Sequence, residues 1–126
     1  MSLRTPLGRV LGLGAAKDGT SHFWGQRVSA LALLFLGSWF VISLSTTTDF
    51  SHGAVIAEVQ RPINGILLLL LLVTMAYHSL LGVQVVIEDY VHSHALKLAA
   101  LVVSRFVHVL FAAAAIYSIL KIGLGA

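Results

Sequence analysis

Three long apolar stretches dominate the sequence, over residues 28–45, 63–87 and 98–120. A helix needs about 20 apolar residues to cross about 30 Å of hydrocarbon, and each stretch has about that length. In lipid the backbone polar groups must be satisfied within the segment, so a helix is the conformation open to each stretch. In the second, every leucine of the run Leu67–Leu72 favours insertion by roughly 0.5 kcal/mol. The sequence therefore predicts an all-α membrane protein with three transmembrane helices.

The composition excludes soluble and disordered classes of protein. Hydrophobic residues make up 58% of the 126 residues and charged residues only 10%, whereas soluble domains carry about a quarter charged residues. Disorder is excluded because it requires low hydrophobicity and high charge. The net charge of +3 comes from scattered residues, so nothing indicates a nucleic-acid partner. Without a repeat or a domain boundary, the sequence predicts a single membrane-anchor domain over residues 1–126.

The sequence contains no cysteine. Disulfides, zinc–thiolate sites and iron–sulfur clusters ligated by this chain are therefore excluded. A redox centre in this chain must use histidine or methionine ligands, or a bound organic cofactor.

Orientation in the membrane follows from the basic residues, which are enriched in cytoplasmic segments. Four of them precede the first apolar stretch: Arg4, Arg9, Lys17 and Arg27. The segment 1–27 also lacks the apolar core of a signal peptide, so we expect it to be cytoplasmic and the C-terminus periplasmic. The short connection 88–97 predicts antiparallel neighbours on either side of it. The connection 46–62 is expected to be a polar, turn-rich loop that ends at Pro62.

His78 is an ionisable residue well inside the second apolar stretch. Such groups are costly in lipid and mark candidate functional sites. Gly82 lies one turn later and Asp89 about three turns later, on the same stripe of the helix. An imidazole beside a glycine suits a flat macrocycle, because the nitrogen can ligate iron and the missing side chain lets the ring lie close to the backbone. From spacing alone, a histidine hydrogen-bonded to a neighbouring helix is the commoner alternative.

Asp89 and Tyr90 end the same helix at the expected cytoplasmic interface, about 16 Å along the helix axis from His78. A phenol beside a carboxylate can donate a hydrogen bond to a carbonyl and deliver a proton to it, as quinone reduction requires. An aromatic interface anchor beside an ordinary solvated acid is the alternative, and residue type alone favours it.

Arg105 and His108 lie three residues apart, on one face of the third helix. Arg105 is close enough to the start of its stretch to extend toward the interface, and for His108 we expect a structural role. The remaining histidines are expected to be solvated, in loops or tails: His22, His52, His92 and His94.

The motif in the second stretch reads His78-SLL-Gly82-VQVVIE-Asp89-Tyr90. With this spacing the chain resembles the hydrophobic membrane anchor subunit of succinate dehydrogenase, respiratory complex II. The block Gly14–Phe40, GAAKDGTSHFWGQRVSALALLFLGSWF, is similar to the alphaproteobacterial branch of that family. The resemblance covers nearly the whole chain, with the third helix the least distinctive, and it implies a bacterial inner membrane as the location.

The resemblance implies three helices packed against a cytochrome b subunit. Together the two subunits would hold one haem b and dock an iron–sulfur and a flavoprotein subunit, whose clusters and FAD pass electrons from succinate toward ubiquinone. His78 is then one axial ligand of the haem iron, with a histidine of the partner as the other, and Arg27 lies near the haem propionates. Tyr90 would hydrogen-bond a ubiquinone carbonyl, and Asp89 would support the pocket and its protons. The resemblance implies no catalytic role for Arg105 or His108.

Two other functions stay open at this point. One is a cofactor-free structural anchor that only recruits soluble subunits, and the other is the anchor of a fumarate reductase-type complex, which runs the reverse reaction on the same scaffold. A small transporter or channel subunit is disfavoured, because the three stretches carry no charges paired across the spans. Under each of the first two functions, as under the resemblance, the chain completes an enzyme and is no catalyst by itself.

Overall fold

The computed structural model describes residues 16–125, with side chains from residue 20 onward. In this part of the chain all regular structure is helical: α2 (Ala16–Thr46), α3 (His52–Gln60), α4 (Pro62–Tyr90) and α5 (His94–Gly123). The three long helices each have the length and the composition to cross a membrane, whereas α3 is short. The predicted all-α fold with three transmembrane helices is confirmed.

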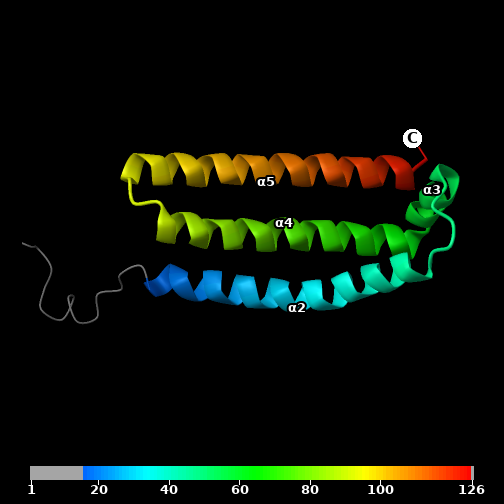
Figure 1. The fold of residues 1–126 in the computed structure, drawn as a ribbon, viewed down its shortest axis with the longest axis horizontal. Helices are drawn as coiled ribbons and strands as arrows, with labels where there is room; N and C mark the ends of the chain where they lie inside the picture. Colours follow the sequence, from blue (N-terminus) through cyan, green and yellow to red (C-terminus); the bar gives the residue numbers. More distant parts are fainter. Residues whose placement is uncertain (1–15, 126) are drawn as a thin grey trace, which may run out of the picture.

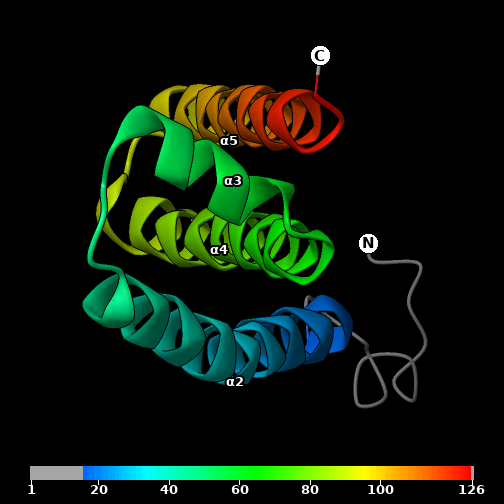
Figure 2. The same ribbon diagram turned by 90° about the vertical axis from the view of Figure 1, so that its right-hand side faces the viewer.

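The three long helices lie side by side with α4 in the middle, and the chain runs along them in alternating directions (Figure 1). Helix α4 packs against both α2 and α5, while α2 and α5 share no contact within the described residues. Seen along the helices, α3 crosses one end of the layer and packs on α4 and α5 (Figure 2). The expected antiparallel pairing of the last two long helices is therefore confirmed.

A single layer of three helices has almost no interior. Within residues 20–125 only Leu81 and Ser29 are buried, and large apolar side chains such as Phe35 and Phe106 are mostly exposed. Exposing apolar surface to water costs about 25 cal/mol per Å². Both faces of the layer are therefore surfaces for lipid or for other subunits.

The helix ends follow from local chemistry. Pro62 occupies the first turn of α4, as predicted, where its missing N–H leaves no helical hydrogen bond unmade. The Ser51 hydroxyl caps α3 by accepting from the Ala54 N–H at 3.4 Å. At the far end of α4, Lys97 Nζ donates to the Glu88 carbonyl at 2.7 Å and so satisfies a terminal carbonyl that has no partner inside the helix.

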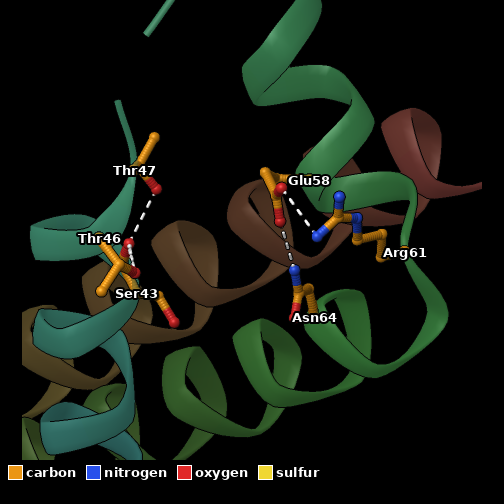
Figure 3. A network of polar contacts seen from close by, with 6 residues as sticks. All are labelled: Ser43, Thr46, Thr47, Glu58, Arg61 and Asn64. Carbon is orange, nitrogen blue, oxygen red and sulfur yellow. Dashed lines mark hydrogen bonds and ion pairs between the residues drawn. The ribbon is translucent and has the colours of Figure 1, made fainter. Parts of the chain in front are cut away.

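A polar network holds the corner between α3 and α4 (Figure 3). Glu58 accepts a hydrogen bond from Asn64 Nδ2 at 2.7 Å and forms an ion pair with Arg61 at 3.0 Å. Gln60 Nε2 donates to the Ile122 carbonyl at 3.2 Å, which ties α3 to the last turns of α5. This corner lies at the end of the layer opposite to the start of α2 (Figure 1). Its contacts join α3 to α4 and α5.

Two expectations about the ends of the elements were wrong. Helix α2 begins well before residue 28, because a helix needs apolar residues only along the part of its length that lies in lipid, and residues 16–27 extend it. Part of the connection 46–62, expected as a loop, forms α3 instead. Arg4 and Arg9 lie outside the described residues, and the cytoplasmic side of the N-terminus stays a prediction.

Candidate functional site

His78 faces α2 from the middle helix. Its Nδ1 lies 2.9 Å from the Ser29 hydroxyl oxygen of α2. That oxygen lies 3.0 Å from the Gln26 backbone carbonyl. Among the described residues, the other ring nitrogen, Nε2, has only the Gln26 side-chain amide nitrogen at 3.4 Å, near the outer limit of a hydrogen bond. One nitrogen of the ring is thus firmly held, and the other is weakly held.

The ring of His78 lines a cavity of about 570 Å³ between α2 and α4. The cavity also contains Arg27 and Gly82, so the structure brings together three residues that the sequence singled out. Arg27 is exposed, and its guanidinium carbon lies 4.4 Å from the centroid of the Phe23 ring. The full lining is His22, Phe23, Gln26, Arg27, Ala30, His78, Gly82 and Val85.

Two polar atoms at this cavity are buried and have no hydrogen-bond partner among the described residues: His22 Nε2 and Gln26 Oε1. Roughly 90% or more of buried polar groups in proteins are hydrogen-bonded, so these two atoms are candidate contacts for a polar group that the described residues do not supply. His22 was expected in a solvated tail, and that expectation was wrong. Because α2 begins earlier than expected, His22 lies on the helix and lines the cavity.

Two glycines at this seam have different reasons to be glycine. A Cβ added at Gly25 would meet Tyr77 Oη at 2.6 Å and Leu81 Cδ1 at 3.2 Å, so a larger residue there would have to displace these two side-chain ends of α4. A Cβ added at Gly82 would meet only Gln26 Nε2 at 3.6 Å, an ordinary contact. Packing within the chain therefore leaves room for a side chain at Gly82, and its absence enlarges the cavity beside His78.

Asp89 and Tyr90 lie apart from this cavity, in the last turn of α4. Both side chains are exposed, with 78% of the Tyr90 surface accessible. The eleven- and twelve-residue separations from His78 correspond to about 16–18 Å along the helix axis. The end of α4 lies beside the start of α5, at the same end of the layer as the start of α2 (Figure 1).

His108 joins α5 to α4. Its Nε2 lies 3.1 Å from the Ser79 hydroxyl of α4, and its Nδ1 lies 2.8 Å from the Ser104 backbone carbonyl one turn earlier. Both nitrogens therefore have hydrogen-bond partners inside the chain, which agrees with the structural role expected for this residue. Arg105 is exposed and lines one apolar groove between α4 and α5, whereas His108 lines another, so the structure does not bring these two residues together.

Comparison with known proteins decides the family. A family model described as succinate dehydrogenase/fumarate reductase transmembrane subunit matches residues 1–115. The chain belongs to this family. A succinate dehydrogenase hydrophobic membrane anchor subunit of Paracoccus denitrificans is 33% identical over 122 residues, which cover 97% of this chain and 94% of the relative. A subunit of the same description from Rickettsia bellii (strain RML369-C) is 35% identical over 94 residues, 75% of each chain.

Family membership confirms the resemblance read from the His78-to-Tyr90 motif. Together with the three candidate spans, it makes the chain a multi-pass membrane protein and a membrane anchor subunit of succinate dehydrogenase. The roles of single residues and of cofactors are a separate question, which depends on the geometry above.

Sequence reasoning missed three residues of α2 at this seam: His22 and Gln26, which line the cavity, and Ser29, which contacts His78. They are spaced i, i+4, i+7, which places them on one face of a helix. The pattern was in the sequence, but an expected helix start at residue 28 left two of the three outside the helix. A search for polar residues at helical spacing across the start of the span would have found it.

Proposed function

We propose that this subunit supplies His78 as one axial ligand of a haem b shared with a cytochrome b subunit, and that the end of α4 contributes to a ubiquinone site. The observation that carries the proposal is the His78 ring itself. One of its nitrogens is held by α2, and the other, weakly held, lines an interhelical cavity with a basic side chain at the same cavity.

The residues present fit a haem. A porphyrin supplies the equatorial nitrogens, so this chain needs to offer one imidazole, and no three His, Asp or Glu side chains within residues 20–125 form a metal cluster of their own. Haem carries two propionates, for which Arg27 offers a guanidinium partner at the cavity. Gly82 leaves space beside the ring, and the two unpartnered buried atoms offer further polar contacts. With a second histidine from the partner subunit, the iron would transfer electrons rather than bind oxygen.

Three residues of the cavity have distinct tasks under this proposal. His78 donates a nitrogen lone pair from a fixed position on α4. Arg27 offsets the negative charge of the propionates at the edge of the cavity. Gly82 keeps the wall beside the imidazole flat, so that a planar ring can lie close to the helix backbone. Helix α2 covers one side of the site and excludes lipid and water from it.

The proposed quinone site uses the last turn of α4. The Tyr90 phenol donates a hydrogen bond to a ubiquinone carbonyl, and Asp89 holds and transfers protons that the reduced quinone takes up. The high exposure of Tyr90 in the single chain supports this role, because a surface group is free to form part of a pocket completed by another subunit.

The end of the layer that carries Arg27, Asp89 and Tyr90 is proposed to face the iron–sulfur and flavoprotein subunits on the cytoplasmic side of a bacterial inner membrane. The iron–sulfur clusters belong to those partners, since this chain has no cysteine to ligate them, and FAD is assigned to the flavoprotein subunit. The broad exposed faces of the three helices are proposed to pack on the cytochrome b subunit and on lipid.

The test is a reduced-minus-oxidised spectrum of the purified complex carrying His78→Ala. We expect the haem b signal to be lost or its midpoint potential to shift, while the flavoprotein and iron–sulfur subunits still co-purify. The matched control is His94→Ala, which removes an exposed histidine at the start of α5 and should leave the spectrum unchanged. An assembled His78→Ala complex with unaltered haem content and potential would favour a cofactor-free anchoring role for this residue.

A further inference from the structure

Ser29 is, with Leu81, one of the two buried residues in the part of the chain whose side chains are described, and it is 5% exposed. It lies on α2 with its hydroxyl between two polar atoms, the Gln26 carbonyl at 3.0 Å and His78 Nδ1 at 2.9 Å. Burying a polar side chain in an apolar membrane protein is costly unless it forms hydrogen bonds. The position of Ser29 is therefore explained by what its hydroxyl does.

The proton of the Ser29 hydroxyl can be placed from these two contacts. A hydroxyl has one proton to donate, and a backbone carbonyl can only accept. The 3.0 Å contact to the Gln26 carbonyl therefore takes the Ser29 proton. The 2.9 Å contact to the imidazole is then a bond in which Nδ1–H donates to the Ser29 oxygen.

The protonation of Nδ1 decides which atom of His78 is available. In a neutral imidazole one nitrogen carries the hydrogen and the other carries the lone pair, so Nε2 is left unprotonated. The orientation of the Gln26 amide fits this assignment, because its nitrogen, which donates, lies 3.4 Å from Nε2. Its oxygen, which could only accept, is the unpartnered atom.

We propose that Ser29 is a positioning residue that fixes the Nδ1–H tautomer and the orientation of His78, and thereby presents Nε2 as the lone pair that a metal can take. The inference rests on the proposed role of His78 as an axial ligand. Histidine ligands commonly donate their second ring N–H to a neighbouring group, which orients the ring and raises its basicity. The weak amide contact from Gln26 occupies the same lone pair and is readily displaced by a metal.

The first experiment needs no haem. The full chain, labelled with 15N-histidine in detergent, is examined by long-range proton–nitrogen correlation, which reports the ring nitrogen that carries the hydrogen. We expect the Nδ1–H tautomer at His78 in the native chain and a mixture of tautomers in Ser29→Ala. Ser29→Thr keeps the hydroxyl and should restore the native pattern. Ser38→Ala is the matched control, because the Ser38 hydroxyl on the same helix bonds only to the Leu34 carbonyl, at 2.6 Å.

The second experiment measures haem in the assembled complex. Loss of the hydrogen bond that orients a ligating histidine typically weakens metal binding by about 10- to 100-fold, so Ser29→Ala should lose haem more readily than the native complex. Its midpoint potential should rise, because a less basic ligand stabilises the oxidised iron less. Ser29→Thr and Ser38→Ala should behave like the native complex in both measurements.

Failure of the inference differs from failure of the proposed function. A His78 tautomer that is Nε2–H in the native chain, or that Ser29→Ala leaves unchanged, overturns the role of Ser29 whatever the haem content. A tautomer that responds as expected, in a complex whose haem is indifferent to His78→Ala, overturns the ligand role of His78 and with it the presentation of Nε2 to a metal.

Discussion

The two sides of α4 carry the same pair of residue types in two different states. Toward α2, His78 contacts Ser29 at 2.9 Å, and toward α5, Ser79 contacts His108 at 3.1 Å. At His108 the second nitrogen is also occupied, by the Ser104 carbonyl at 2.8 Å. At His78 the second nitrogen has a single contact of 3.4 Å and lines a cavity with Arg27.

This difference offers a criterion for separating a candidate ligand from a structural histidine when both lie within membrane-spanning helices. A ring with two strong partners has no lone pair to offer without breaking a bond. A ring with one strong partner is oriented and still has a donor atom available. Hydrogen-bond saturation, rather than depth in the membrane or the presence of a serine neighbour, distinguishes the α2–α4 seam from the α4–α5 seam.

The largest effect is expected from a side chain that fills the cavity beside His78, which tests whether this cavity holds the haem. Gly82→Leu places a side chain beside His78, and overpacking of about 1–3 kcal/mol corresponds to a roughly 5- to 150-fold loss of haem affinity. Gly82→Ala should have a much smaller effect, since its Cβ meets only Gln26 Nε2 at 3.6 Å. Haem content of the purified complex is the measurement, and the control is Gly37→Leu on α2, where an added Cβ would meet no described residue beyond its own helix backbone within 4 Å. Full haem content in Gly82→Leu would contradict the placement of the haem at the seam between α2 and α4.

A second prediction concerns the last turn of α4, which lies outside the His78 cavity. Tyr90→Phe removes only the phenol hydroxyl, and a lost hydrogen bond of about 0.5–1.5 kcal/mol predicts a roughly 2- to 12-fold higher KM for ubiquinone. Tyr117→Phe, at another exposed tyrosine, on α5, should leave the quinone kinetics unchanged. Steady-state quinone reduction by the complex measures both, and equal KM values in the two variants would assign Tyr90 to the interface alone.

The three spans and the motif residues could be predicted from the sequence, because hydropathy over about 20 residues and the positions of costly groups are local properties. The length of α2 could not be predicted in this way, because hydropathy marks the apolar part of a helix and not the polar turns that extend it. That single error concealed His22 and Gln26, and it made His22 look solvated. The short helix α3 was missed because its polar neighbours resemble a loop.

The contrast between the two histidines also lay outside the sequence. His78 and His108 each lie in an apolar stretch near small residues, and spacing favoured a hydrogen-bonded role for both. Only the packing of α4 between α2 and α5 shows that His78 contacts Ser29 and that His108 contacts Ser79. The same packing shows that Nε2 of His78 has the weaker contact. That pairing depends on three-dimensional packing, for which a single sequence carries no direct signal.

The smallest expected effect comes from the saturated histidine. His108→Ala removes an interhelical hydrogen bond, and such bonds in membranes contribute about 0.6 kcal/mol on average. We therefore expect a slight fall in the thermal stability of the complex, with native haem content and midpoint potential. Ser79→Ala, which removes the other partner of the same bond, should lower the stability by a similar amount, and the double variant should add little further. A loss of haem in His108→Ala would show that a fully bonded imidazole can still serve a cofactor, and the distinction between the two seams would no longer hold.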